Sequence, residues 1–233
     1  MDSIEKMHQE KTAEGYFETI NTDLVEKIPD HPGKILDIGC AAGKLGEEVI
    51  KRKHPETYEG IEVVRPVAEI AGKYLDEVYV GQAEEWLPQL GAASYDWVIM
   101  ADSLEHTVDP WDILREVNRI LKKDGHVLVS VPNVRNLGVV TDLLVKGTWD
   151  YKDMGILDRG HLRFFTKRNI LHILREHGFD PQLIYSNPRN RWKKFRGRFI
   201  SRCLSLLIGR PSDYEEFITV QWRIVAKKIK EIS

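Results

Sequence analysis

Hydrophobic and polar positions follow two alternating patterns along this chain. Short apolar runs of the kind that fill buried strands recur, and between them apolar residues return every three or four positions, as on one face of a helix. The runs predict seven strands, near Lys34–Ile38, Tyr58–Glu62, Glu77–Val80, Tyr95–Ala101, Gly125–Val131, Phe179–Tyr185 and Phe217–Ala226. Strands that alternate with helices at this spacing predict an α/β protein with a doubly wound, mostly parallel sheet.

Helical patterns fill most of the intervals between these strands. The predicted helices are a lead-in helix over Glu10–Ile28, stopped by Pro29 and Pro32, and then Lys44–Lys51, Asp109–Leu121 and Thr166–His177. Two segments, Asn133–Arg163 and Asn187–Ser212, fit neither pattern. Insertions of this length on a compact scaffold are more often functional than idle, so we expect them to form a lid.

Length and composition indicate a single domain. The chain has 233 residues, a formal net charge of -2 and two cysteines, which are too few for a disulfide framework. It shows neither an N-terminal apolar signal region nor a run of about 20 apolar residues. We therefore expect a cytoplasmic protein with four parts: a lead-in helix (1–32), a core (33–186), a basic insertion (187–212), and a final strand and tail (213–233).

A small-residue turn follows the first predicted strand. Lys34–Ile38 leads into Gly39-Cys-Ala-Ala-Gly43, and the helix pattern begins directly afterwards. A turn of this kind at the carboxyl end of a parallel strand is where α/β proteins bind nucleotide-like ligands. The turn alone does not identify the ligand, because NAD enzymes share it and other strand–turn–helix units use glycine only for packing.

Four further segments after or before strands carry suggestive residues in a regular order. The full set is Asp37-Ile-Gly-Cys-Ala-Ala-Gly43, Gly60-Ile-Glu62, Gly81-Gln-Ala-Glu84, Ala101-Asp-Ser-Leu-Glu-His106 and Leu121-Lys-Lys-Asp-Gly125. This set resembles the class I S-adenosylmethionine-dependent methyltransferases over about residues 33–186. The resemblance implies a Rossmann-like methyltransferase fold whose seventh strand is antiparallel, and S-adenosyl-L-methionine as the cofactor.

The resemblance also implies which residues bind the cofactor. Glu62 would accept hydrogen bonds from the ribose hydroxyls, and Tyr16 would close over the cofactor. The other implied contacts are the turn residues Asp37, Gly39, Cys40, Ala41 and Gly43, the adenine-edge residues Gln82 and Ala83, and the methionyl-flanking residues Ala101 and Asp102. Two positions depart from the family pattern, since Ala41 replaces the middle glycine of the turn and Gln82 stands where the family more often has Asp.

Two histidines are the candidate general bases. The resemblance places His106 at the rim of the cofactor cleft, and neutral imidazole suits removal of a hydroxyl proton near pH 7. The second candidate is His161, within Asp158-Arg-Gly-His-Leu-Arg-Phe-Phe-Thr166. This segment resembles an element of methyltransferases associated with polysaccharide or glycolipid assembly. Within it Arg163 is a candidate for contact with an anionic or hydroxylated acceptor, or else a brace for the lid.

A metal site is the alternative role for one of these histidines. Asp102, Glu105 and His106 repeat the Glu-x-x-Glu-His pattern of ubiquinone-pathway O-methyltransferases, where the cluster resembles a divalent-metal site, with Asp in place of the first Glu. Such a trio would offer ligands to Mg²⁺. We expect no metal and keep the trio as the alternative.

The segment 187–212 is basic. It holds eight Arg and Lys residues and no acidic residue. Helical spacing places one apolar face on Trp192, Phe195, Phe199, Cys203 and Leu206. A basic amphipathic helix suits an anionic membrane surface, so Arg189–Arg210 is a candidate contact for a protein peripheral at the inner membrane surface. A lid, a dimer contact, or a clamp for a phosphate-rich substrate by Arg189 and Arg191 remain open.

The pattern as a whole predicts a methyltransferase that methylates a hydroxyl group, since a histidine base suits that acceptor. The acceptor would be a small molecule, a sugar or a lipid-linked compound. A NAD-dependent oxidoreductase would not explain the Leu104-Glu-His-Thr-Val-Asp-Pro110 segment, and a base-modifying enzyme would carry an Asn/Asp-Pro-Pro-aromatic element there, so no nucleic-acid partner is expected. A non-catalytic protein that binds S-adenosylmethionine remains the other reading.

Overall fold

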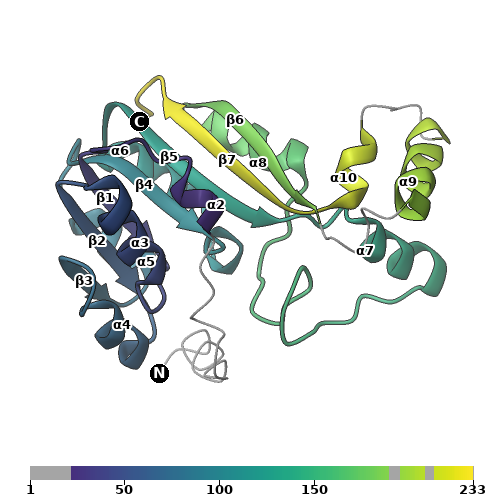
Figure 1. Cartoon of the computed structure of the whole chain (residues 1–233), viewed down its shortest axis with the longest axis horizontal. Helices are drawn as coiled ribbons and strands as arrows, with labels where there is room; N and C mark the ends of the chain where they lie inside the picture. The colour runs from purple at the N-terminus through teal and green to yellow at the C-terminus, as the bar shows by residue number, and fades with distance from the viewer. Residues whose placement is uncertain (1–21, 189–194, 208–212, 233) are drawn as a thin grey trace.

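The computed structural model describes residues 22–188, 195–207 and 213–232, and its centre is a seven-stranded sheet (Figure 1). The strands are β1 (Lys34–Ile38), β2 (Thr57–Glu62), β3 (Glu77–Val80), β4 (Tyr95–Ala101), β5 (Leu121–Pro132), β6 (Phe179–Pro188) and β7 (Thr219–Lys228). Their order is β3-β2-β1-β4-β5-β7-β6. The first five strands pair in parallel, and β7 is antiparallel to both β5 and β6. This confirms the predicted fold class and the antiparallel last strand.

Helices cover both faces of the sheet. The described helices are α2 (Thr22–Val25), α3 (Lys44–Lys53), α4 (Arg65–Ala71), α5 (Ala83–Trp86), α6 (Pro110–Ile120), α7 (Leu137–Thr141), α8 (Lys167–Glu176), α9 (Phe195–Leu207) and α10 (Tyr214–Ile218). Of these, α7, α9 and α10 lie beyond one end of the sheet (Figure 1). Short 3₁₀-helices span Leu87–Gln89 (η1) and Leu104–His106 (η2), and one π-helical segment spans Asp142–Lys146 (η3). Among the described residues, no helix is long and apolar enough to cross a membrane.

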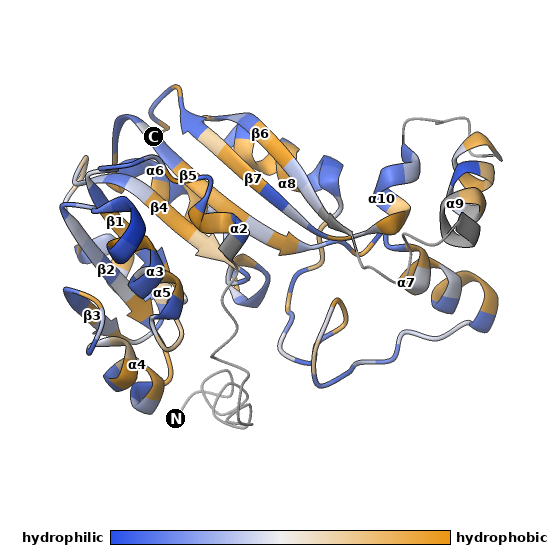
Figure 2. Ribbon diagram, in the orientation of Figure 1, coloured by the Kyte–Doolittle hydropathy of each residue, from blue (hydrophilic) through white to orange (hydrophobic). Residues whose placement is uncertain are grey.

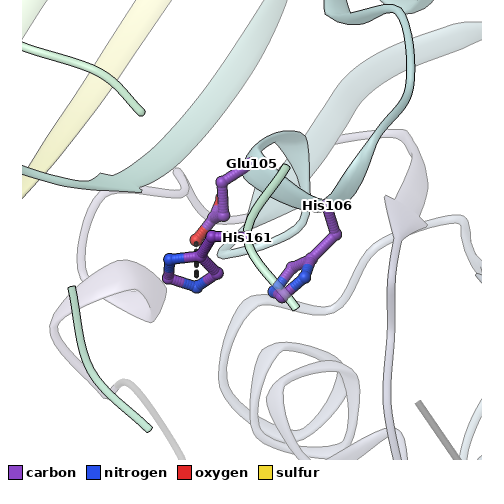
Figure 3. A group of neighbouring side chains, drawn as sticks. All are labelled: Glu105, His106 and His161. Atoms are coloured by element: carbon purple, nitrogen blue, oxygen red, sulfur yellow. Dashed lines mark ion pairs between the residues drawn. The ribbon is translucent and has the colours of Figure 1, made fainter. Parts of the chain in front are cut away.

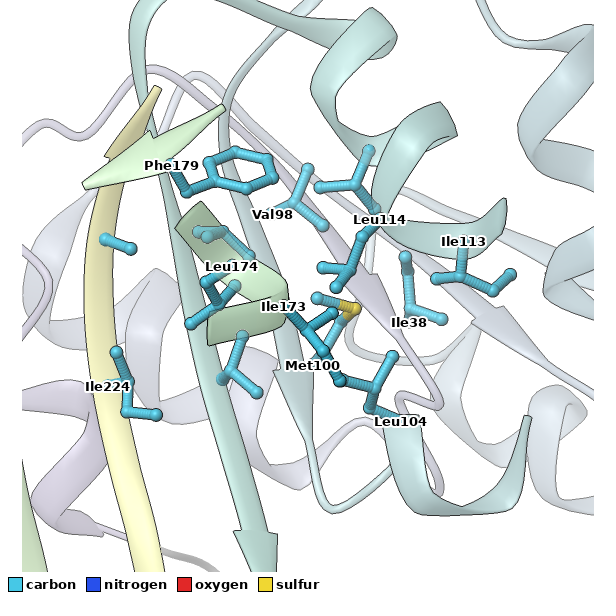
Figure 4. Close-up of a cluster of buried hydrophobic side chains, with 14 of the residues drawn as sticks. Ile38, Val98, Met100, Leu104, Ile113, Leu114, Ile173, Leu174, Phe179 and Ile224 are labelled. Carbon is cyan, nitrogen blue, oxygen red and sulfur yellow. The ribbon is translucent and has the colours of Figure 1, made fainter. Parts of the chain in front are cut away.

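Two hydrophobic cores lie on opposite faces of the sheet, because strands buried on both sides send alternate residues to each face. On β4, Val98 and Met100 face α6 and α8, whereas Trp97 and Ile99 face α2 and α3. Figure 4 shows the first of these cores, in which Leu174 of α8 and the start of β6 meet the β4 side chains. Apolar residues accordingly concentrate along the central strands in Figure 2.

Some element boundaries differ from the sequence prediction. The last strand was predicted from Phe217, but Tyr214–Ile218 forms α10 and β7 begins at Thr219. Thr219 closes this helix, since its Oγ1 donates to the Glu215 carbonyl at 2.7 Å. Of the lead-in helix predicted over Glu10–Ile28, only Thr22–Val25 is helical within the described part. The rest of that prediction up to residue 21 lies outside the described residues.

The chain reverses its direction of sheet growth between β1 and β4. From β1 it adds β2 and β3 on one side, and from β4 it adds β5 on the other. Ligands of doubly wound sheets bind beside the carboxyl ends of the strands at such a switch point. The segments that follow β1, β2 and β4 at this edge are the glycine turn, Glu62 with its following loop, and η2.

Candidate active site

The turn after β1 takes left-handed backbone conformations at three positions. Gly39 has φ 77°, Ala41 has φ 50° and Gly43, the residue before α3, has φ 74°. Glycine adopts this region freely, but alanine does so only with strain, so Ala41 departs from the family pattern at a position where glycine would be easier. A Cβ built on Gly39 would lie 2.8 Å from the Cβ of Ser103. The turn therefore packs tightly against the loop that leads into η2.

Glu62 ties the end of β2 to this turn. Its Oε2 accepts the Ala41 N–H at 3.0 Å, and its Oε1 accepts the Val64 N–H at 2.8 Å. The side chain is only 6% exposed, and burial raises the pKa of Glu62 while the backbone N–H groups lower it. A carboxylate has further lone pairs beyond these two bonds, so Glu62 can still accept the predicted hydrogen bonds from two ribose hydroxyls.

Asp37 lies beneath the turn, where it is 2% exposed. Tyr58 donates its hydroxyl to Asp37 Oδ2 at 2.8 Å, and burial raises the pKa of Asp37 to about 7. Cys40 is also buried, and burial raises the pKa of its thiol. Its Sγ lies against Gly60, so close that a Cβ on Gly60 would be 2.5 Å from it. These two side chains support the turn from below, and their predicted contact with cofactor stays a prediction.

Asp37→Asn is expected to flatten the dependence of protein stability on pH. A carboxyl group whose pKa is raised on folding contributes stability that is complete below its unfolded value of about 3.9 and is lost as the pH rises to about 7. Over this window the free energy of unfolding should fall by up to about 4 kcal/mol on account of this one group. The asparagine amide oxygen still accepts from Tyr58 but does not titrate.

Urea unfolding at a series of pH values between about 4 and 8 measures this effect. Asp30→Asn is the control for loss of an exposed carboxyl group, because Asp30 lies at the surface, where it pairs with Lys53 at 3.1 Å. Parallel profiles for the natural chain and the Asp37→Asn variant would contradict the assignment.

The other predicted cofactor residues follow β3 and β4. Gln82 precedes α5, and Ala83 at its first position is buried. Asp102 adopts φ 58°, and its Oδ1 accepts hydrogen bonds from Ser130 of β5, at 3.0 Å, and from Gln221 of β7. Burial raises the pKa of Asp102. Asp102 is thus held between β4, β5 and β7 at the sheet edge. Tyr16, which was predicted to close over the cofactor, lies outside the described residues.

Two histidines and a carboxylate meet beside this edge (Figure 3). Nδ1 of His106 lies 2.8 Å from the Gly160 carbonyl, and Nδ1 of His161 lies 3.0 Å from the Ile156 carbonyl. A carbonyl only accepts, so each Nδ1 carries the hydrogen and the lone pair of each neutral ring is on Nε2. The two rings meet edge to face with centroids 4.8 Å apart, and Glu105 Oε1 lies 3.9 Å from His161 Nε2.

The structure groups a different trio from the one kept as the alternative metal site. Glu105, His106 and His161 each offer one ligand atom within 4.8 Å of the others, whereas Asp102 is engaged with Ser130 and Gln221 and is not part of the group. Two imidazoles and one carboxylate suit a first-row transition metal better than Mg²⁺, which prefers oxygen ligands. The sequence prediction missed His161 as a member because it lies on a separate loop.

Backbone hydrogen bonds hold the His161 loop against η2. The N–H groups of Leu162 and Arg163 both donate to the Glu105 carbonyl, at 2.9 and 3.0 Å. The Arg163 guanidinium donates to the Val108 carbonyl and lies over the Trp111 ring, 5.8 Å from its centroid. Arg163 therefore braces the loop, which is the structural alternative to its predicted contact with the acceptor.

A cleft adjoins the histidine pair. It is a shallow hollow of about 450 Å³, largely open to solvent and lined by Tyr151, Arg159, His161 and Leu162. Sequence reasoning selected His161 and the segment Asp158–Thr166 that contains Arg159, but it named neither Arg159 nor Tyr151 as a site residue.

The basic insertion contains α9, and of its predicted apolar face the structure describes the side chains of Phe199, Cys203 and Leu206. Phe199 and Leu206 are 62% and 63% exposed, whereas Ser201 and Ser205 are buried. The helix contacts α10, and the Arg202 guanidinium lies over the Tyr214 ring. Residues 189–194, including Trp192 and the predicted clamps Arg189 and Arg191, lie outside the described residues.

Comparison with protein families finds a match to the methyltransferase domain over residues 8–183. The ubiquinone biosynthesis O-methyltransferase of Yersinia enterocolitica is 33% identical over 133 residues, which are 51% of this chain and 54% of that protein. The enzyme of the same name from Acinetobacter baylyi is 28% identical over 179 residues, 68% of this chain and 70% of the relative. The chain thus spans about half the length of the first relative.

Solved structures share the fold. A SAM-dependent methyltransferase from Archaeoglobus fulgidus superposes with a TM-score of 0.67 and 20% identity, covering 96% of this chain and 99% of that one. The [4+2]-cyclase SpnF superposes with a TM-score of 0.63 and 19% identity, covering 89% and 79%. A cyclase among the neighbours illustrates that this fold by itself does not determine the reaction.

Proposed function

The chain belongs to the methyltransferase domain family, with the class I S-adenosylmethionine-dependent fold, and we propose that it methylates a hydroxyl group of a small-molecule acceptor. The observation that carries the proposal is the pair of imidazoles beside the carboxyl edge of the sheet, each with its Nδ1 hydrogen held by a backbone carbonyl. The named ubiquinone-pathway O-methyltransferases among its relatives support a hydroxyl acceptor.

In this proposal His106 is the general base. When bound, S-adenosylmethionine supplies a methyl group on a positively charged sulfur. His106 Nε2 removes the acceptor's hydroxyl proton, while the Nδ1–H bond to the Gly160 carbonyl keeps the ring oriented. The acceptor oxygen would take the methyl group, and S-adenosylhomocysteine would leave. His161 and the buried carboxylate of Glu105 stabilise the positive charge that the His106 ring gains. The glycine turn and Glu62 position the cofactor.

Thermal unfolding with cofactor analogues tests the first part of this proposal. S-adenosylhomocysteine at about 100 times its Kd should stabilise the chain by about 2.7 kcal/mol, which raises the unfolding midpoint by several degrees. NADH should leave the midpoint unchanged. A rise with NADH alone would overturn the cofactor assignment, and a rise with S-adenosylhomocysteine without methyl transfer to any hydroxyl acceptor would favour a non-catalytic binding protein.

A finer proposal concerns where the acceptor is found. Leu144 and Val145 on η3 are 76% and 78% exposed, and Phe199 and Leu206 on α9 are also exposed. The segment that follows α7 and the helix α9 lie at the same end of the molecule in Figure 1, and α9 belongs to the basic segment 187–212. Apolar side chains next to Lys and Arg residues suit an anionic membrane surface. We propose that the chain docks there and takes a lipid-linked acceptor.

Co-sedimentation with vesicles tests this docking. The chain should sediment with vesicles that contain phosphatidylserine and remain in solution with pure phosphatidylcholine. The double variant Leu144→Ser, Val145→Ser should weaken vesicle binding about tenfold or more, since each buried apolar side chain contributes about 1.5–3 kcal/mol. Ile229→Ser is the control, because Ile229 is also an exposed apolar residue, 64% exposed, on the segment after β7. Equal binding to both kinds of vesicle, or to neither, would contradict the proposal.

A further inference from the structure

Asp102 leaves β4 in a left-handed backbone conformation, with φ 58°. Few side chains adopt this conformation without strain, and residues held in it gather at ligand sites. The Asp102 N–H donates to the Ser130 carbonyl at 3.1 Å, just after Ala101, the last residue of β4 that pairs with β5. The end of β4 is therefore fixed in this conformation by the neighbouring strand.

Only one oxygen of the Asp102 carboxylate is bonded within the described part of the chain. Oδ1 accepts the Ser130 hydroxyl of β5 at 3.0 Å and the side-chain N–H of Gln221 on β7, a residue 119 positions away. No described residue donates to Oδ2. Asp102 is accessible to solvent at the sheet edge, so a ligand can reach this second oxygen and donate a hydrogen bond to it.

A buried arginine favours the charged form of this carboxylate. Arg223 lies two residues after Gln221, on the same face of β7, and it pairs in register with Ser130 of β5. It is 2% exposed, and its Nη1 donates to Asp23 of α2 at 2.6 Å. Desolvation raises the pKa of Asp102, whereas its two hydrogen bonds and the charge of Arg223 lower it. The residues of β7 therefore both hold the carboxylate and favour its negative charge.

We infer that Ser130 and Gln221 are positioning residues of the cofactor site, which hold Oδ1 of Asp102 so that Oδ2 receives the ammonium group of the cofactor's methionyl part. The inference rests on the proposed function and adds the cofactor group that this carboxylate binds. S-adenosylmethionine and S-adenosylhomocysteine both carry this ammonium group, and a carboxylate binds it through a charge-assisted hydrogen bond. The antiparallel strand β7 thereby takes part in cofactor binding, although the sequence placed all the cofactor contacts after β1 to β4 and at Tyr16.

Calorimetric titration of the full chain with two ligands tests this inference. One ligand is S-adenosylhomocysteine. The other is 5′-methylthioadenosine, which has the same adenosine and sulfur but ends in a methyl group, without the amino and carboxylate groups. The natural chain should bind S-adenosylhomocysteine about tenfold or more tightly than 5′-methylthioadenosine.

The Asp102→Asn variant removes the charge and keeps the network. Its amide oxygen still accepts from Ser130 and Gln221, while an N–H group takes the place of Oδ2 and cannot accept from an ammonium group. The Kd for S-adenosylhomocysteine should therefore rise about tenfold or more. The Kd for 5′-methylthioadenosine should stay unchanged, because that ligand has no ammonium group.

Two variants of Gln221 test the positioning role itself. Gln221→Ala should raise the Kd for S-adenosylhomocysteine about threefold to tenfold and leave the Kd for 5′-methylthioadenosine unchanged. Gln221→Glu should weaken S-adenosylhomocysteine at least as much, because it replaces the donor by a second carboxylate beside Asp102. Gln89→Ala is the matched control, since Gln89 also donates one side-chain hydrogen bond, to the Glu85 carbonyl at 2.7 Å, and should change neither Kd.

The outcomes separate this inference from the proposed function. Normal binding of S-adenosylhomocysteine by Asp102→Asn or by Gln221→Ala would overturn the inference, as would equal affinity of the natural chain for the two ligands. Equal weakening of both ligands in the Gln221 variants would also overturn it, because a purely structural role affects the whole cofactor site. The proposed function survives all these results. Failure of the natural chain to bind S-adenosylhomocysteine would reject the proposed function and the inference with it.

Discussion

His106→Asn should lower kcat about 10²- to 10⁴-fold while the Kd for S-adenosylhomocysteine stays unchanged. The asparagine amide nitrogen takes the place of Nδ1 and can still donate to the Gly160 carbonyl, so the loop contact is kept. What the variant loses is the Nε2 lone pair that removes the acceptor's proton. Loss of turnover without loss of cofactor binding separates the chemical role of this histidine from a structural one.

Two further histidine variants complete this experiment. His172→Asn is the control, since His172 is exposed on α8 and should leave kcat unchanged. His161→Asn should lower kcat less than His106→Asn, because His161 stabilises charge in the proposed mechanism and does not take the proton. The reverse order, with His161 indispensable and His106 dispensable, would exchange the two roles.

Glu62→Ala should weaken S-adenosylhomocysteine binding about 100-fold or more and abolish the thermal shift at concentrations that saturate the natural chain. Hydrogen bonds to a charged group contribute about 1.5–3 kcal/mol each, and the ribose offers two hydroxyls to this carboxylate. The variant also removes the partner of the Ala41 and Val64 N–H groups. The free energy of unfolding without ligand should therefore fall by about 1–3 kcal/mol.

Glu59→Gln is the matched control for the Glu62 variant. Glu59 lies on the same strand, but its Oε2 accepts the hydroxyls of Tyr79 and Tyr95. This variant should change stability without changing the Kd for S-adenosylhomocysteine at a temperature where the chain is folded. An unchanged Kd in Glu62→Ala would remove the residue from the cofactor site and leave it a purely structural tie between β2 and the turn.

The central strands β1 and β4 were predictable because they are buried on both faces, and the edge strand β3, whose residues are exposed or partly buried, was predictable from its Val-Tyr-Val run before Gly81. A strand buried on both faces is a continuous apolar run that ends where a turn begins. All three strands have the bounds that the pattern predicted. The glycine turn and the order of strand-end residues were equally local, and they led to the family that the comparisons support. Turn formation and burial on both faces each depend on a few neighbouring residues, so both can be predicted from the sequence.

The site depended on contacts between distant segments. The bond from His106 to Gly160 joins residues 54 positions apart, and it brings His161 and Arg159 beside η2, which no local pattern displays. Because the His161 loop packs on η2, the Arg163 guanidinium donates to the Val108 carbonyl. The same contact places His161, and not Asp102, beside Glu105 and His106. The spacing of apolar residues predicted a helix at α9, but contact with α10 decides which of its faces is buried. Ser201 and Ser205 are among the buried residues. Sequence alone determined the sheet, the turn and the family, whereas the identity of the residues that share the cleft was decided by loop docking.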